Sequence, residues 1–353
     1  MIRVVIEATS LTLTSGGLAR YTSELSQALA RCFPEDEYFL TSDQAFPMPE
    51  SAPQNLKCGG VPRNSMERRW WLWGLTREST RLHADLVHGP DFAVPYLSRR
   101  PSVLTLHDLS PWMEKSWHHA ADRVRRRTPV LLEMGIATMI ITPSERVRRA
   151  AIDRFRLRPD RIVAIPEAAA PWFRPSLPVQ ESRPPYFIFV GTLEPRKNLP
   201  ALLSAWREVR RHHEVDLVLA GRRREDFDEL TQESGLRVLG EVPDAALPEL
   251  YSNALAFVYP SLYEGFGLPV LEAMQCGAPV IASSAVTEAG GDVALYADDH
   301  DSIVNAMTTV AEHPERRAEW RAQSLARAAQ FSWERTARLT HDVYLEAVKR
   351  FGK

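Results

Sequence analysis

The hydrophobic pattern changes period repeatedly along the chain. Short runs rich in β-branched and aromatic residues, such as RVVIEA at 3–8 and YFIFV at 186–190, predict buried strands. The stretches between them place apolar residues three or four positions apart, as Leu18, Tyr21 and Leu25 are, and these predict helices. The alternation of the two predicts a parallel sheet covered by helices.

The same two patterns extend over most of the chain. We expect further strands at 84–89, 101–107, 138–142, 161–166, 215–221, 254–260 and 279–283. We expect helices at 17–33, 144–155, 199–213, 244–254, 269–276, 302–310 and 332–351. Ser144 suits the N-cap of the second of these helices because its hydroxyl can accept an amide hydrogen bond.

A proline-rich stretch, PWFRPSLPVQESRPP, separates two such series of elements. Proline has no amide N–H, so this stretch fits neither a central strand nor a helix interior. We therefore predict an α/β fold with two Rossmann-like domains facing across a cleft. The predicted limits are 1–170 for the N-terminal domain, 171–185 for the linker, 186–332 for the C-terminal domain and 333–353 for a terminal helix that packs back on the N-terminal domain.

Composition narrows the class of protein. A chain of 353 residues suits two domains, and a net charge of −2 gives no reason to expect nucleic acid. Its three widely spaced cysteines fit a reducing cytoplasm better than a disulfide framework or a zinc site. The apolar run at the N-terminus is too short for a signal peptide, and no segment approaches the ~20 apolar residues of a membrane span.

The stretch YEGFGLPVLEAMQCGAPVIAS at 263–283 begins where a predicted strand ends, at the edge where open α/β sheets bind ligands. Pro269 suits the first turn of the next helix, and the amides of Gly267 and Leu268 would favour an anion there. The alternative is a plain turn, in which Glu272 only complements the helix dipole by ~0.3–1 kcal/mol.

A second segment, FVGTLEPRKN, also passes from strand through a glycine turn to a helix. Gly191 ends the strand, and Arg196 and Lys197 precede a helix that Asn198 can cap. Two cations beside the positive end of a helix conflict, and a negatively charged ligand would resolve the conflict. Solvated surface charges are the alternative, but the neighbouring 263–283 stretch favours the ligand.

Two weaker candidates lie in the first half of the chain. Gly16 and Gly17, in SGGLARY, open the first helix and would let a diphosphate approach the backbone closely. His107 and Asp108, in LTLHDLSPW, follow a strand at its ligand-facing end. A structural role for the histidine is equally open from the sequence.

These segments, with TPSE, GGDVALYADD and AMQCGAPVIAS, resemble family 4 glycosyltransferases of the GT-B fold over nearly the whole chain. The resemblance implies an N-terminal acceptor-binding domain and a C-terminal nucleotide-sugar-binding domain. It implies catalytic roles for His107, Glu264, Arg196 and Lys197. It implies donor-binding roles for Gly16, Gly17, Gly191, Arg196, Lys197, Gly240, Glu241, Val242, Glu264, Gly265, Phe266, Gly267, Leu268 and Glu272.

Within that picture Arg196 and Lys197 would bind the donor diphosphate and Glu272 the ribose. Glu264 would hold the donor sugar, His107 would lie beside the reacting sugar, and the base would lie near 238–243. The family retains the anomeric configuration. No residue stands out as the nucleophile of a double displacement, so a front-side displacement fits better.

We expect neither metal nor cofactor. An acidic run, ADDHDS, could suggest a metal site, but aspartate is a strong helix cap and we favour a cap before the helix at 302–310. Cations and helix N-termini would then stabilise the departing diphosphate, each charged hydrogen bond contributing ~1.5–3 kcal/mol.

The similarity of GTLEPRKN and HDLSP to bacterial mannosyl- and rhamnosyltransferases favours GDP-mannose as donor and a saccharide or lipid-linked saccharide as acceptor. The basic, aromatic segments 68–75 and 122–129 could contact the inner face of the cytoplasmic membrane. We favour instead core tryptophans on one helix and a solvated arginine face on the other.

Other classes of protein remain as alternatives. They are a GT-B-fold epimerase or phosphorylase, a non-catalytic nucleotide-sugar-binding protein, and a dinucleotide oxidoreductase. The last lacks its G-x-G-x-x-G motif.

Overall fold

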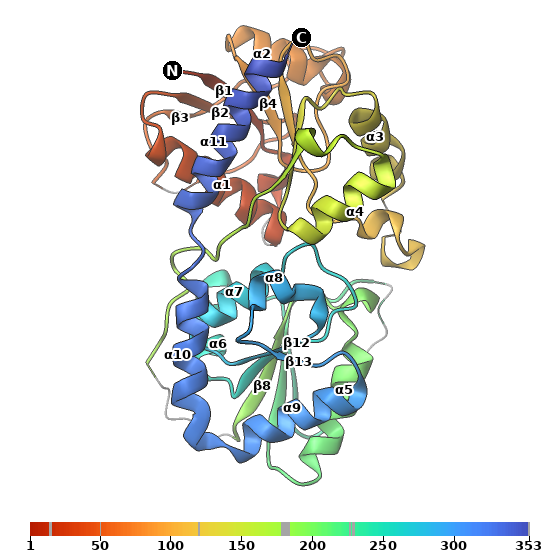
Figure 1. Cartoon of the computed structure of the whole chain (residues 1–353), viewed down its shortest axis with the longest axis vertical. Helices are drawn as coiled ribbons and strands as arrows, with labels where there is room; N and C mark the ends of the chain where they lie inside the picture. The colour runs from red at the N-terminus through yellow and green to blue at the C-terminus, as the bar shows by residue number, and fades with distance from the viewer. Residues whose placement is uncertain are drawn as a thin grey trace. The chain divides into compact units, whose positions relative to one another are not determined.

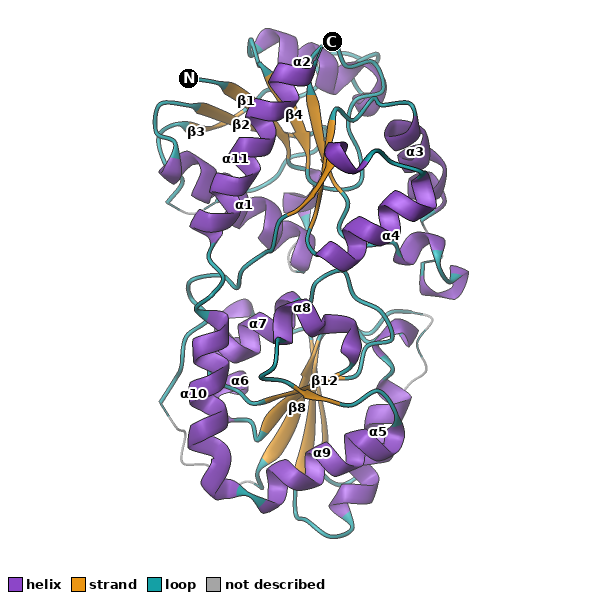
Figure 2. Cartoon of the chain, in the orientation of Figure 1, coloured by secondary structure: helices purple, strands orange, loops and turns teal. Residues whose placement is uncertain are grey.

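The chain divides into two compact units, Met1–Glu167 with Ser332–Lys353, and Ala168–Phe331. This computed structural model describes residues 1–13, 16–49, 51–118, 121–177, 184–225, 227 and 230–351. Each unit has one parallel sheet of its own with helices on both faces (Figures 1 and 2). No helix in these ranges is both long and apolar enough to cross a membrane.

Unit 1, the first of these, contains a seven-stranded sheet in the order β3-β2-β1-β4-β5-β6-β7. Its strands are β1 Arg3–Glu7, β2 Glu37–Thr41, β3 Leu56–Cys58, β4 Leu86–Gly89, β5 Ser102–Thr105, β6 Met139–Thr142 and β7 Ile162–Ala164. Its α-helices are α1 Gly17–Cys32, α2 Leu75–Arg81, α3 Asp122–Glu133, α4 Glu145–Phe155 and α11 Trp333–Arg350.

The C-terminal helix α11 packs on unit 1, beside α1 (Figure 1). Its buried side chains recur at helical spacing and include Tyr344, which is fully buried. The Tyr344 hydroxyl lies 2.7 Å from Nδ1 of His88, and His341 Nε2 lies 2.8 Å from a carboxylate oxygen of Asp36. Polar contacts therefore fix the register of this helix on the unit.

Unit 2 contains a six-stranded sheet in the order β10-β9-β8-β11-β12-β13. Its strands are β8 Tyr186–Val190, β9 Asp216–Ala220, β10 Leu236–Gly240, β11 Ala256–Tyr259, β12 Val280–Ala282 and β13 Leu295–Tyr296. Its α-helices are α5 Leu199–Arg210, α6 Leu247–Asn253, α7 Leu268–Gln275, α8 Thr287–Gly290, α9 His300–Glu312 and α10 Arg317–Ala328.

The central strands are continuous apolar runs because helices cover both faces of each sheet. Every residue of β4, β5, β6, β9 and β11 is buried. The prediction of two parallel-sheet α/β domains is confirmed. The expected helix at 144–155 is confirmed as well, and Ser144 caps it by accepting a hydrogen bond from the Val147 amide.

Sequence patterns missed three edge strands, β3, β10 and β13, and also the inner strand β2 and the helices α8 and α10. Edge strands are only partly covered, so their apolar runs are short or interrupted, and β10 leaves Val238 49% exposed. The tryptophan segment, expected as an ordinary helix, forms a π-helical turn at Trp70–Gly74 that runs into α2.

The described part of the proline-rich stretch, 171–177 and 184–185, forms neither helix nor strand. Phe173 is fully buried in the core of unit 2. The side-chain amide of Gln275 donates to the carbonyls of Ala170 and Phe173 at 2.9 and 2.7 Å. This segment therefore packs onto unit 2, and residues 178–183 lie outside the described ranges.

The strand orders place a topological switch point in each sheet, between β1 and β4 in unit 1 and between β8 and β11 in unit 2. Ligands of open α/β sheets bind outside the carboxyl ends of the strands at such a point. In unit 2 the segments that follow β8 and β11 are GTLEPRKN and YEGFG. The topology therefore brings together the two motifs that the sequence singled out.

Three glycines end three neighbouring strands of unit 2. Gly191, Gly221 and Gly240 follow or end β8, β9 and β10, and all have positive φ (148°, 144° and 68°). Backbone hydrogen bonds link Gly191 to Ala220 and Gly221 to Gly240. A Cβ on Gly221 would overlap the carbonyl of Gly191, so this edge of the sheet is packed backbone to backbone.

We expect Gly221→Ala to lower the free energy of unfolding by roughly 3 kcal/mol, because it adds a steric overlap to an unfavourable φ. Gly240→Ala is the matched control, since its φ is also positive but nothing lies within 4 Å of the added Cβ. Chemical denaturation of both variants measures the difference. Equal losses would show that the close backbone packing is not important for stability.

Candidate active site

The carboxyl edge of unit 2 is organised around a buried ion pair between its two predicted motifs. Lys197 ends the 3-10 turn after β8, and Glu264 lies in the turn after β11. The Lys197 ammonium donates to Glu264 at 2.6 Å and also to the Tyr259 hydroxyl. Both charged side chains are nearly buried, at 5% and 7% exposed. The pair joins the two turns on either side of the switch point.

Arg196 extends the pair into a chain of alternating charge. Its guanidinium contacts Glu194 at 2.8 Å and Glu264 at 3.1 Å, and it donates to the carbonyl of Tyr263 at 2.8 Å. Arg224 reaches the other oxygen of Glu194 at 3.3 Å. Burial of so many charges is tolerated because each has an opposite partner.

This network shifts the titration of its members. Burial alone would raise the pKa of Glu264, but the charges of Arg196 and Lys197 outweigh it and lower the pKa to about 2. Burial lowers the pKa of Lys197, and the charge of Glu264 opposes that shift. Glu264 is therefore ionised at all ordinary pH values and holds the ammonium in place.

The sequence predicted a negatively charged ligand that offsets Arg196 and Lys197 at the start of α5. The structure offsets these two cations in a different way. Carboxylates of Glu194 and Glu264, rather than a ligand alone, balance Arg196 and Lys197. Asn198 occupies the N-cap position of α5, but its side chain makes no capping hydrogen bond. It adopts a left-handed conformation (φ 54°) that asparagine tolerates better than most residues.

The turn before α7 presents backbone amides at the same edge. Gly267 has φ 108° and forms the N-cap, and Pro269 lies in the first helical turn as predicted. A Cβ on Gly267 would press on Val286, so glycine is required both for conformation and for space. In the described chain no hydrogen bond uses the amide of Gly267 or Leu268. These N–H groups are available to an anion.

The remaining predicted donor contacts lie close to this edge in the fold. Gly265 and Phe266 belong to the same turn, and Phe266 packs against Phe331. Glu272 lies inside α7 and is 1% exposed. Gly191 lies beside Lys197, whose Cε is 3.9 Å from the position of an added Cβ. The donor-binding roles of these residues stay predictions.

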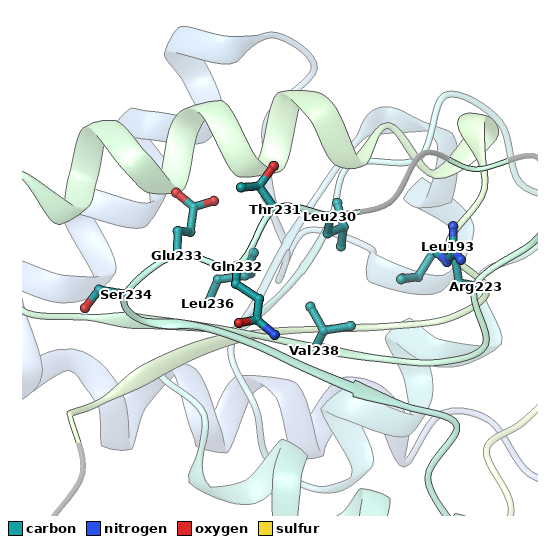
Figure 3. Close-up of a pocket in the computed structure, with 9 residues that line it drawn as sticks. All are labelled: Leu193, Arg223, Leu230, Thr231, Gln232, Glu233, Ser234, Leu236 and Val238. Carbon is teal, nitrogen blue, oxygen red and sulfur yellow. The ribbon is translucent and has the colours of Figure 1, made fainter.

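The predicted base-binding segment follows β10. Gly240 ends that strand, Glu241 is exposed and Val242 is half-buried. A cavity of about 570 Å³ lies beside β10, lined by Leu236 and Val238 on one face of the strand and by the segment that precedes it (Figure 3). Gly240, Glu241 and Val242 do not line it. Val238 is the residue that the cavity lining shares with the predicted base segment 238–243, so the cavity overlaps that segment only at its start.

In unit 1, His107 follows β5 and is fixed by two acceptors. Nδ1 lies 3.2 Å from the Glu167 carboxylate, and Nε2 lies 2.7 Å from the Pro90 carbonyl. Both partners only accept hydrogen bonds, so both ring nitrogens donate and the ring is cationic. Burial lowers the pKa of His107, but the Glu167 hydrogen bond and charge outweigh burial and the net shift is upward. His107 is thus a fixed cation rather than a free base.

Two acids of unit 1 at the switch point, Glu7 and Asp91, were not predicted from the sequence. Glu7 ends β1, is 1% exposed and accepts hydrogen bonds from Thr9 and from Trp70. Burial raises its pKa to about 7. Asp91, two residues past β4, also has a pKa raised by burial. The sequence could have indicated both residues, because each acid lies at or just after the end of a predicted strand and polar residues at the carboxyl ends of strands often line sites.

Gly16 and Gly17 begin α1 and are exposed. Gly16 has φ 114°, and nothing lies within 4 Å of an added Cβ. The start of α1 therefore leaves open space beside the backbone, as a close approach of a ligand would need. These two glycines and His107 belong to unit 1, whereas the other predicted site residues belong to unit 2.

The acidic run ADDHDS, residues 297–302, is a helix cap, as expected. Asp299 accepts a hydrogen bond from the Ser302 amide at 2.8 Å and forms a capping box at the start of α9. Asp298 accepts from the Ser284 amide at 2.7 Å. Metal-independent chemistry stays a prediction.

The Glu264 network predicts a specific acid sensitivity. A carboxyl whose pKa falls from 4.5 to about 2 on folding stabilises the fold above pH 4.5, and this contribution disappears as pH falls towards 2. The shift corresponds to about 3 kcal/mol. Chemical denaturation at pH values from 7 down to 2 measures this contribution. Glu264→Gln should lose that stability at pH 7 and flatten the pH dependence, whereas Glu319→Gln at an exposed pair should not. A Glu264→Gln curve parallel to wild type would contradict the assignment.

The contacts of His107 predict that the ring remains doubly protonated at pH 7. Nitrogen-15 chemical shifts of the ring should show imidazolium, and Glu167→Gln should lower the pKa of His107, because burial is then opposed by fewer groups. The stability that this pair provides is complete below pH 6.5 and is lost as pH rises through the raised pKa. A neutral ring at pH 7 in the wild-type protein would refute the double-donor arrangement.

Two family models and two Escherichia coli relatives that match this chain are all glycosyltransferases. The family model described as Glycosyltransferase Family 4 matches residues 15–171, and Glycosyl transferases group 1 matches residues 178–326. O-antigen chain mannosyltransferase B of Escherichia coli is 38% identical over 73% of this chain and 74% of its own length. Serotype-specific mannosyltransferase WbdA of Escherichia coli is 30% identical over 67% of this chain, which spans only 32% of that relative.

Solved structures share the fold at low sequence identity. Anabaena HepE in complex with UDP-glucose superposes with a TM-score of 0.74 at 17% identity, covering 98% of this chain and 100% of that one. WaaG, a glycosyltransferase involved in lipopolysaccharide biosynthesis, superposes with a TM-score of 0.70 at 15% identity over the whole of both chains. The two family models and the 38% identical Escherichia coli relative show that this chain is a glycosyltransferase and belongs to family 4, with the GT-B fold.

Proposed function

We propose that this glycosyltransferase moves mannose from GDP-mannose to a saccharide or lipid-linked saccharide acceptor, in the assembly of a bacterial surface polysaccharide in the cytoplasm. The observation that carries the proposal is the edge of unit 2, where Lys197 and the amides of Gly267 and Leu268 present positive charge and unused donors. The choice of mannose is supported by the two mannosyltransferase relatives.

The donor's diphosphate would be bound by the groups that the switch point collects. Lys197 is a buried cation of fixed position, which acts on a nearby phosphate more strongly than a solvated one. The N-terminus of α7 adds backbone donors without a charge of its own. Glu264, ionised and held by Lys197 and Arg196, would accept hydrogen bonds from sugar hydroxyls, and Glu272 from the ribose.

We propose a metal-independent front-side displacement with retention of configuration. The bond from the anomeric carbon to the phosphate oxygen breaks, and negative charge grows on the departing diphosphate. The acceptor hydroxyl attacks from the same face, and the departing phosphate oxygen takes its proton. His107 cannot take that proton while both its ring nitrogens donate, but its positive charge suits a site where phosphate charge develops.

The alternatives have less support. An epimerase or phosphorylase on the same fold needs acid and base carboxylates or an inorganic phosphate site at the anomeric end. A non-catalytic nucleotide-sugar-binding protein would not need the set of charged residues that this chain keeps at two strand ends. Neither alternative accounts for the mannosyltransferase relatives.

Donor binding tests the proposal directly. We expect GDP-mannose to raise the melting temperature more than UDP- or dTDP-sugars do, because a bound ligand stabilises the native state. Slow hydrolysis of GDP-mannose without acceptor should accompany binding. If no nucleotide sugar binds or is hydrolysed, the proposal is wrong.

Two substitutions separate the roles assigned within the site. Lys197→Ala should weaken binding of GDP and GDP-mannose about 10- to 100-fold, the equivalent of one charged hydrogen bond. Glu272→Ala should weaken GDP and free guanosine alike, because its predicted partner is the ribose. Calorimetric titration measures both, with Arg207→Ala on the exposed face of α5 as the control. Wild-type affinity in both variants would place the donor elsewhere.

A further inference from the structure

Helix α3 gathers three arginines on one face. Arg123, Arg126 and Arg127 are three and four positions apart, and with Tyr96 and Val130 they line a cavity of about 440 Å³ in unit 1. Like charges at this spacing repel one another. The sequence predicted a solvated arginine face here, and that prediction is wrong for Arg127, which is 8% exposed.

Arg127 has no polar partner in the described chain. It makes no hydrogen bond or ion pair to any described residue, and its buried Nε has no acceptor. The ring of Trp71 covers one face of its guanidinium at 4.6 Å, which leaves the N–H groups at the rim unused. A buried guanidinium is normally paired, because an unsatisfied charge is costly to bury.

Its neighbour Arg125 shows the usual arrangement. Arg125 donates to the carbonyls of Pro111 and His118 at 2.6 Å each and pairs with Asp122 at 3.0 Å. Asp122 is the acid that lines the cavity, and Arg125 already engages it. The guanidinium of Arg125 therefore has hydrogen-bond acceptors within unit 1, whereas the guanidinium of Arg127 has none among the described residues.

Other acids act on Arg127 only from a distance. Asp91 and Glu7 attract it without forming an ion pair, and burial raises the pKa of both carboxyls. Arg123, exposed on the same helix, repels it. The cavity therefore has an excess of positive charge that described residues of unit 1 do not neutralise.

We propose that this cavity is a phosphate-binding site, in which Arg127 is the buried anchor, Arg123 and Arg126 close over the anion, and the Tyr96 hydroxyl adds a donor. A guanidinium presents its N–H groups as a planar fork that matches two phosphate oxygens, and the cation–π contact with Trp71 holds that fork in orientation. Several guanidinium groups together suit an anion with more than one charge.

The phosphate has two sources with the same chemistry. One is a phosphate or diphosphate that links the saccharide acceptor to its lipid, and this source rests on the proposed function. The other is the headgroup of an anionic lipid. The site itself depends on neither, since it is argued from the unpartnered arginine.

Calorimetric titration with inorganic pyrophosphate tests the site in the full chain. We expect Arg127→Gln to weaken binding by tenfold or more and Arg123→Gln by about threefold, because each removes charged hydrogen bonds. Arg316→Gln is the matched control, since Arg316 also covers a tryptophan ring, at 4.7 Å, but lies in unit 2. Arg123 is exposed, so its variant keeps the test valid even if Arg127→Gln fails to fold.

The outcomes separate this site from the donor site. Wild-type pyrophosphate affinity in both the Arg127 and Arg123 variants would overturn the proposal, as would binding that disappears only with Lys197→Ala. If no nucleotide sugar binds the wild-type chain but pyrophosphate binding still depends on Arg127, the proposed function fails and the phosphate site stands.

Vesicle sedimentation then identifies the source. Binding to phosphatidylglycerol but not phosphatidylcholine vesicles, lost in Arg127→Gln and competed by pyrophosphate, supports the site with a lipid headgroup. Pyrophosphate binding that depends on Arg127, without vesicle binding, supports the site with an acceptor phosphate. Vesicle binding that is equal in the wild type and both variants, with no loss of pyrophosphate affinity, contradicts it.

Discussion

The ion pair between Lys197 and Glu264 is the constraint on which the site of unit 2 depends. It joins the turn after β8 to the turn after β11, the two strands between which the order of the sheet reverses. An ammonium and a carboxylate with so little exposure can coexist only if they stay together, since a lone buried charge costs several kcal/mol. The pair therefore keeps the amides of the α7 start in register with the cations of the other turn.

The two units use buried positive charge differently. In unit 2, Glu194 and Glu264 balance Arg196 and Lys197, so the fold tolerates these cations without a ligand. In unit 1, His107 is balanced by Glu167, whereas Arg127 packs on the ring of Trp71 and has no charged partner among the described residues. Under the two proposals, the donor diphosphate would bind in unit 2 and a second phosphate would bind beside Arg127 in unit 1.

Much of the fold was readable from the sequence, because buried parallel strands and amphipathic helices carry strong periodic signals. Edge strands such as β10 lack such a signal because they are only partly covered. The ion pair between Glu194 and Arg196 has no periodic signal either. The candidate motifs were found because glycine, proline and charged residues follow strands. The pairing of Glu264 with Arg196 and Lys197 was missed because those contacts arise only when β8 and β11 lie side by side. Arg127 was misjudged for a similar reason: a run of arginines reads as a solvated face, and only packing against Trp71 buries one of them.

The central claim is that the edge around Lys197 and the start of α7 binds the diphosphate of the donor. An experimental structure of the chain with GDP bound tests it most directly. The account predicts phosphate oxygens within hydrogen-bonding distance of the Lys197 ammonium and of the amides of Gly267 and Leu268. GDP bound instead in the cavity beside β10, with those amides and Lys197 unchanged, would contradict it.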